Sequence, residues 1–145
     1  MQSNIVKFLQ QKHIVSFSVF ADQEMWSAIC FYVFDPDTNS LILRTSDETR
    51  HGQLMLKNTQ VTGTIIHDTE TVAKLQGIQF TGVISELKNN EKQTALDRYY
   101  ARFPYARVMK SPVWHIALQE VKFTDNTLGF GKKTLWTRNN PEQIS

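Results

Sequence analysis

Apolar residues recur at two different spacings along this chain, and the spacings predict which segments are strands and which are helices. Every second residue is apolar over Val15–Val19, which is typical of a strand with one buried face. Ile5, Phe8 and Leu9 instead follow a helical spacing, and Ser3 is placed to cap that helix. The same patterns predict strands over 13–20, 26–34, 41–45, 61–66, part of 73–87, 113–123 and 135–137, and helices over 3–12, 49–58 and 90–103.

The predicted strands follow one another too closely for the crossover connections that a parallel sheet needs. We therefore expect a mainly β fold, an antiparallel barrel of six to seven strands with two to three short peripheral helices. The strand over 26–34 is apolar on both sides, so both of its faces should be covered. Asn90 followed by Gln93 resembles a capping box at the start of the third helix. Within 73–87, four residues are expected to share one face: Ile78, Phe80, Gly82 and Ile84.

The connection between the strands at 41–45 and 61–66 carries a dense group of anion-binding side chains. It reads Thr45-Ser46-Asp47-Glu48-Thr49-Arg50-His51 and opens the helix predicted over 49–58. Hydroxyls and the first N–H groups of a helix bind anions, and the helix dipole favours negative charge there. The planar guanidinium of Arg50 matches a phosphate. We hypothesise that this turn holds a phosphate; the alternative is a solvated helix start whose charges are incidental. Arg44 is expected to pair with Asp47 or Glu48 in preference to reaching the same anion.

Length and composition indicate one domain over residues 1–145, with a flexible tail over 138–145. The chain has 16 basic and 14 acidic residues, a balance that does not indicate nucleic-acid binding. Cys30, the single cysteine, lies in an apolar run and is expected to be a small buried hydrophobe; no metal-ligand spacing is present. No signal peptide or membrane span is recognised, so we expect a cytoplasmic protein.

The order of these segments resembles the FMN-binding split barrels related to pyridoxamine 5'-phosphate oxidase, and more narrowly the small uncharacterised bacterial members of that superfamily. The resemblance covers about residues 13–123. It depends on TS at 45–46, TRH at 49–51, LKN at 56–58, the strand over 61–66, and IQFTG at 78–82. It implies an antiparallel split β-barrel that binds FMN at the interface of a homodimer.

The resemblance also implies which residues contact the cofactor. Arg50 and His51 stand where the family has a basic pair that holds the FMN phosphate, although a lysine is common at the second position. Histidine is only partly charged at neutral pH, and a bound phosphate would favour its imidazolium form. The second strand reads WSAICFYVF and lacks the arginine and lysine of the pyridoxamine oxidases, so pyridoxamine phosphate is not the expected substrate. The implied cofactor-binding residues are Arg50, His51, Thr45, Ser46, Gln79, Ser27 and Ala28.

Several other residues have two interpretations. The Gln79 amide would face the polar edge of a flavin, but a backbone partner would satisfy it equally well. Trp114 is expected in the core or at a dimer interface, with flavin stacking as the lesser alternative. His115 can act as an acid or base, but a lone histidine on a strand is more often a hydrogen-bonded residue. The GFGKK sequence at 129–133 lacks the spacing of a nucleotide-binding loop and is interpreted as a turn, although Lys132 or Lys133 could close over an anion.

Two functions follow from these observations. The first is an FMN-dependent oxidoreductase of unknown substrate, in which the flavin supplies the redox chemistry. The alternative is a non-catalytic split-barrel module that binds a flavin or a haem-type ligand. Stacking of single-stranded nucleic acid on aromatic residues is a weaker third possibility, because no basic stripe is present. The two-sided apolar strand and the aromatic content predict a homodimer.

Overall fold

The computed structural model describes residues 1–139, which form seven strands and three α-helices. Every strand and helix expected from the sequence is present within a few residues of its predicted bounds. The strands are β1 Ile14–Ala21, β2 Glu24–Asp35, β3 Ser40–Arg44, β4 Gln60–Ile66, β5 Gln76–Glu86, β6 Val113–Asp125 and β7 Lys133–Thr137. The α-helices are α1 Ser3–Gln11, α2 Arg50–Lys57 and α3 Asn89–Arg102, and short 3₁₀ turns are η1 Val72–Lys74, η2 Pro104–Val108 and η3 Asn126–Leu128.

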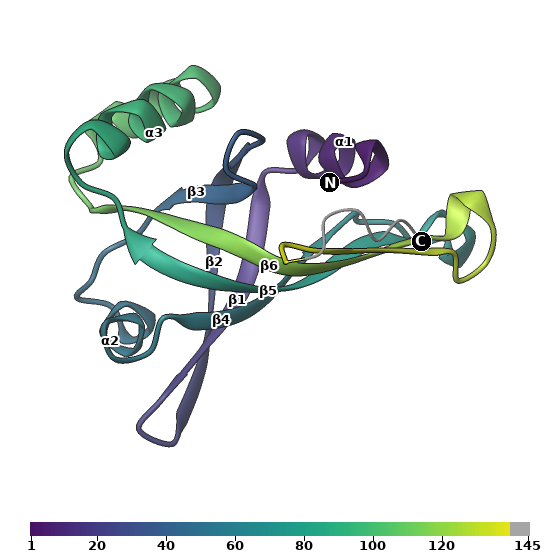
Figure 1. Ribbon diagram of the computed structural model, residues 1–145, viewed down its shortest axis with the longest axis horizontal. Helices are drawn as coiled ribbons and strands as arrows, with labels where there is room; N and C mark the ends of the chain where they lie inside the picture. Colours follow the sequence, from purple (N-terminus) through teal and green to yellow (C-terminus); the bar gives the residue numbers. More distant parts are fainter. Residues whose placement is uncertain (140–145) are drawn as a thin grey trace.

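All strand pairs are antiparallel, in the order β3-β2-β1-β4-β5-β6-β7. A further pairing between β3 and β6 closes strands β1 to β6 into a ring, which confirms the predicted antiparallel barrel. The first part of β6 pairs with β3 and its later part with β7, and the β5–β6 register shifts between Thr81 and Gly82. The barrel is therefore split along β6. Figure 1 shows the helices at its periphery and the β1–β2 hairpin projecting beyond the other strands.

The barrel interior is filled by the inward-facing residues of the alternating strands. On β5 these are Ile78, Phe80, Gly82 and Ile84, as the sequence predicted. Helix α1 adds Ile5, Phe8 and Leu9 to the same core, and α2 adds Leu54 and Met55. Both helices thus supply apolar side chains to the barrel.

A second, smaller cluster lies on the outer surface of the barrel beneath α3. Val33 of β2, Ile42 of β3 and Val113 of β6 pack there against Ala95 and Tyr99 of α3. This helix therefore covers the end of β2 that carries Val33. The expectation that both faces of β2 are covered is met only at that end within the described chain, because Met25, Ile29 and Phe31 are exposed.

Two predicted helix caps are not formed. Helix α1 has Gln2 at its N-cap, so Ser3 lies inside the helix and does not cap it. Helix α3 follows Lys88, and the Gln93 amide donates to Asp97 and does not complete a capping box with Asn90. The chain enters α3 through Asn89, whose φ of 57° lies in the left-handed region. The helix begins two residues earlier than a cap at Asn90 requires, because local sequence signals fix helix ends poorly.

Arg138, the first residue of the predicted tail, lies at the split in β6. Its backbone N–H donates to the Gln119 carbonyl at 2.8 Å. Its guanidinium donates to the carbonyls of Leu118, Thr38 and Asn39 at 2.7–3.0 Å. This side chain therefore links β6 to the β2–β3 turn. The rest of the predicted tail, from residue 140 onward, lies outside the described residues.

Candidate ligand-binding site

The turn before α2 is organised by hydrogen bonds within the turn itself. Thr49 caps the helix by accepting from the Gly52 N–H at 3.0 Å, and its hydroxyl donates to the Ser46 carbonyl at 2.8 Å. The Ser46 hydroxyl accepts from the Glu48 N–H at 3.0 Å. A Cβ on Gly52 would lie 2.3 Å from the Ser46 carbonyl oxygen, so the helix approaches the turn more closely than another side chain would allow. The Ser46 and Thr49 hydroxyls are therefore engaged in holding the turn.

The His51 side chain lies on the side of this turn that faces the barrel core. Its Nε2 lies 2.6 Å from the Thr45 hydroxyl and 3.2 Å from the Thr49 hydroxyl, and its ring meets Phe17 edge to face. Burial lowers the pKa of His51 below its ordinary value, so the imidazole is neutral at neutral pH. The sequence suggested a charged partner for a phosphate, whereas in the structure His51 joins the end of β3 to the start of α2.

Arg50 lies on the outside of the same turn. Its guanidinium forms an ion pair with Glu24 at 3.0 Å and stacks over the Trp26 ring, 4.1 Å from the ring centroid. Both partners belong to β2, and the Arg50 and Glu24 side chains are about half exposed, at 50% and 51%. An exposed ion pair of this kind contributes little to stability. Arg50 is therefore held loosely, and its donors remain available to a ligand anion.

Arg44 and Thr45 hold other parts of the chain in place through hydrogen bonds. Arg44 is buried and donates to the Tyr100 hydroxyl at 2.7 Å and to the carbonyls of Ala106 and Ser111 at 3.3 and 2.5 Å. The predicted ion pair of Arg44 with Asp47 or Glu48 is therefore wrong, because the guanidinium holds the segment after α3. Trp114, expected in the core or an interface, is buried, and its indole N–H donates to the Thr45 carbonyl at 3.0 Å.

The remaining predicted contacts lie on β2 and β5. Ala28 is buried, whereas Ser27 is exposed and its hydroxyl lies 2.9 Å from that of Ser18 on β1. Gln79 is also exposed, and the register places it in one row with Ile29, Ser16 and Thr64 across β2, β1, β4 and β5. Three strand spacings separate the ends of this row, roughly 14 Å. Ser27 and Gln79 therefore lie on the same outer surface of the barrel.

We call this surface the outer face; it is made by outward-facing residues of β1, β2 and β4. Ile29, Met25 and Ile66 are 75%, 74% and 65% exposed on it, which is unusual for residues of their size. A hollow of about 630 Å³ lies between Ile29 and Ile66, and a second of about 460 Å³ is walled by Met25, Trp26 and Ser27. The outer face is defined by Ile14, Ser16, Ser18, Phe20, Met25, Ser27, Ile29, Phe31, Thr62, Thr64 and Ile66.

Polar groups stand at one end of the outer face, and Arg50 lies on the other side of β2, against Glu24 and Trp26. Arg50 stacks on Trp26, a wall of the smaller hollow. Lys12, His13 and His67 line the larger hollow, and the Lys12 ammonium lies 2.9 Å from Nδ1 of His67. The sequence did not single out these three residues, because they come from segments 54 residues apart that only the β1–β4 pairing brings together. An apolar floor, hydroxyls and the Lys12 ammonium at one end can together hold a flat ligand that carries an anionic group.

Other candidates from the sequence have ordinary structural roles. Burial raises the pKa of the Cys30 thiol to about 11, so it is protonated at neutral pH. Gly129 and Gly131 adopt positive φ in the turn before β7, as the turn interpretation of GFGKK predicted.

Within residues 1–139, His, Cys, Asp and Glu side chains form no group suited to a metal ion. No helix in this part of the chain is long and apolar enough to cross a membrane.

Solved structures with the same fold include several cofactor-binding proteins. ChuZ from Campylobacter jejuni superposes over 98% of this chain with a TM-score of 0.76 and 14% identity. A heme-binding protein from Mycobacterium smegmatis matches 90% with a TM-score of 0.68 and 16% identity. The chain spans only 60% and 55% of the lengths of these two proteins. A FAD-binding protein from Mesorhizobium loti matches 83% of this chain and is itself 92% covered, with a TM-score of 0.68 and 11% identity. The fold is thus that of the split barrels related to pyridoxamine 5'-phosphate oxidase.

Sequence comparison is more specific. No family model matches the chain. A UPF0306 protein from Serratia proteamaculans is 47% identical over 137 residues, which is 94% of this chain and 95% of that protein. A UPF0306 protein from Yersinia pestis is 45% identical over the same length, with 93% of it covered. Identity at this level along nearly the whole chain means that this protein belongs to the UPF0306 family.

Proposed function

We propose that this protein binds a flat aromatic cofactor of the flavin or haem type on its outer face, as a split-barrel binding module. The observation that carries the proposal is an open sheet surface whose apolar residues lie beside hydroxyls, with the Lys12 ammonium at one end. A flat ring system would cover Ile29 and its neighbours, and an anionic tail would reach a cation at the edge. Cofactor-binding proteins with the same fold support this reading.

Arg50 suits the phosphate of FMN, whereas His51 does not supply the second positive charge that the sequence suggested. Arg50 offers exposed guanidinium donors beside the N-terminus of α2, which suits a phosphate. His51 is neutral and bonded to two hydroxyls, so it would support the turn and would not add charge. We therefore propose Arg50 and the first N–H groups of α2 as contacts of the FMN phosphate, and Ser27 and Gln79, on the outer face, as contacts of the rest of the cofactor. The site would be supported from behind by residues that do not contact the cofactor directly: Thr45, Ser46 and Ala28.

A haem-type ligand is the second candidate, and a separate observation favours it. His13 and His67 line the larger hollow, and histidine is the commonest axial ligand of haem iron. Lys12 stands beside His67 and could pair with a propionate carboxylate. Both candidates place the ring on the same apolar floor, so one protein surface accounts for either ligand.

A homodimer forms part of this proposal. Large exposed apolar side chains on one sheet surface are expected to be covered by a ligand, a partner or both. A two-fold pairing of outer faces would bury them and enclose two equivalent ligand sites. The dimer would complete each site with residues from the second copy.

The test is absorption spectroscopy of the purified protein, followed by titration with FMN, riboflavin and haemin. The proposal predicts saturable binding of FMN or haemin at one site per chain, and binding of neither would refute it. An Ile29→Glu variant should bind both ligands more weakly, because a carboxylate would stand on the apolar floor. If FMN binds, reduction by nicotinamide cofactors will separate an FMN-dependent oxidoreductase from a carrier, since a bound flavin supplies hydride transfer.

A further inference from the structure

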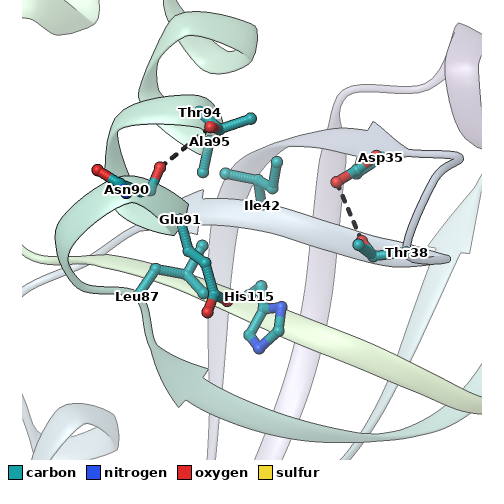
Figure 2. Close-up of a pocket in the computed structure, with 9 residues that line it drawn as sticks. All are labelled: Asp35, Thr38, Ile42, Leu87, Asn90, Glu91, Thr94, Ala95 and His115. Atoms are coloured by element: carbon teal, nitrogen blue, oxygen red, sulfur yellow. Dashed lines mark hydrogen bonds between the residues drawn. The ribbon is translucent and has the colours of Figure 1, made fainter.

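A separate cleft lies between the first turns of α3 and the barrel, on the opposite side of β2 and β3 from the core. Its volume is about 240 Å³, roughly the space of eight water molecules. Figure 2 shows that its side chains come from α3, β6, β3, the β2–β3 turn and the connection before α3. The floor is apolar and made by Ile42, Leu87 and Ala95, which are all buried. The cleft therefore has room for a small organic molecule with a short apolar part.

His115 belongs to a row of four strand residues, two of them polar and two apolar. The register places Ser85, His115, Ile42 and Val33 side by side across β5, β6, β3 and β2. Ile42 and Val33 are buried beneath α3, whereas the His115 ring faces the cleft and its Nε2 lies 2.8 Å from the Ser85 hydroxyl. Burial lowers the pKa of His115, so the imidazole is neutral at neutral pH. A neutral imidazole bonded to a hydroxyl adds polarity to the cleft without positive charge.

The charged groups that line the cleft are both carboxylates. Asp35 accepts from the Asp37 N–H and the Thr38 hydroxyl, and Arg98 reaches it from outside the cleft at 3.5 Å. Glu91 stands on the first turn of α3 above His115 and, within residues 1–139, has no cation at ion-pair distance. Among residues 1–139, no lysine or arginine lines the cleft. The lining itself therefore attracts a cation, although Arg98, Arg138 and the N-terminus of α3 offset part of that attraction.

The oxygen atoms around the cleft can accept hydrogen bonds from that cation. The Thr94 hydroxyl donates its hydrogen to the Asn90 carbonyl at 3.0 Å, so its lone pairs remain for a ligand donor. Asn90 and Thr38 add further oxygens at the rim. We infer that this cleft binds a small primary ammonium ion with a short apolar body. The ammonium would lie between Glu91 and the neutral His115, and the apolar body would cover Ile42.

The experiment follows the His115 ring signals by NMR while n-butylammonium chloride, n-butanol or sodium butyrate is added at one pH and ionic strength. We expect a saturable shift with n-butylammonium, a much weaker one with n-butanol, and none with butyrate. A bound ammonium ion should also lower the pKa of His115 further, because it adds positive charge beside the ring. Asp35 and Glu91 raise that pKa and Arg138 lowers it in the free protein, so the titration is compared with and without ligand.

Glu91→Gln removes the unpaired carboxylate, and we expect about fivefold weaker binding of n-butylammonium, since an exposed ionic contact contributes up to about 1 kcal/mol. Glu70→Gln, in the connection between β4 and η1, makes the same change of charge away from the cleft and should bind like the natural protein. The inference is overturned if His115 does not respond to n-butylammonium, if n-butanol binds equally well, or if the two variants behave alike.

Discussion

Replacing Arg50 by alanine separates a ligand-binding role from a structural one. In the free protein Arg50 has an exposed ion pair with Glu24 and an exposed stacking contact with Trp26. Each contact contributes at most about 1 kcal/mol at such a site. The two contacts together contribute at most about 2 kcal/mol, so we expect Arg50→Ala to lower the melting temperature of the ligand-free protein by about 8 °C or less.

The effect on FMN binding should be much larger. A charge-assisted hydrogen bond to the phosphate contributes roughly 1.5–3 kcal/mol, so Arg50→Ala should weaken FMN binding about ten- to a hundredfold. Fluorescence quenching of FMN measures the dissociation constant directly. Riboflavin lacks the phosphate, and its affinity should change little in the variant. Arg107→Ala is a matched control, because Arg107 also stacks on an aromatic ring, that of Tyr100, away from the outer face.

A second variant tests the same contact in the opposite direction. Glu24 competes with a ligand for the Arg50 guanidinium, so Glu24→Gln should tighten FMN binding by up to about fivefold. If the natural protein binds FMN and Arg50→Ala binds it equally well, the phosphate is held elsewhere. An equal loss of FMN and riboflavin affinity would mean that Arg50 supports the ring site and not the phosphate.

Three further predictions concern assembly and stability. Ile29→Glu should convert the proposed dimer into a monomer, and sedimentation of the natural protein as a monomer at micromolar concentration would contradict the dimer. Gly52→Ala should destabilise the protein by about 1–3 kcal/mol in urea unfolding, because its Cβ would meet the backbone of the preceding turn, whereas Gly77→Ala has ordinary space; equal effects would refute this account. Burial lowers the pKa values of His51 and His115, so the unfolded chain binds more protons and stability should fall as pH drops through about 6.5; replacing both by glutamine should flatten that slope in urea unfolding at about pH 7.5 and about pH 5.5.

Local sequence determined the elements of this fold and most of their buried faces. The alternation on β1 and β5 identified the residues that fill the barrel, because successive side chains on a strand point to opposite faces. The spacing of strands excluded parallel crossovers and left an antiparallel barrel. Thr49 and Arg50 were correctly placed at the start of α2 by hydroxyl and turn signals that act within a few residues. These features are short-range, so the sequence alone carries them.

The candidate site depends on contacts that no local pattern encodes. Arg44 donates hydrogen bonds to residues after α3, because the pairing of β3 with β6 closes the barrel. Glu24 pairs with Arg50, 26 positions away in the sequence, because α2 packs on β1 and β2. The apolar pattern of β2 predicted two covered faces, but α3 covers only the end near Val33 and leaves Ile29 open. Side-chain period shows which residues share a face, whereas only the packing of distant elements decides whether that face is covered. The outer face, on which the proposed function rests, was therefore decided by the tertiary structure.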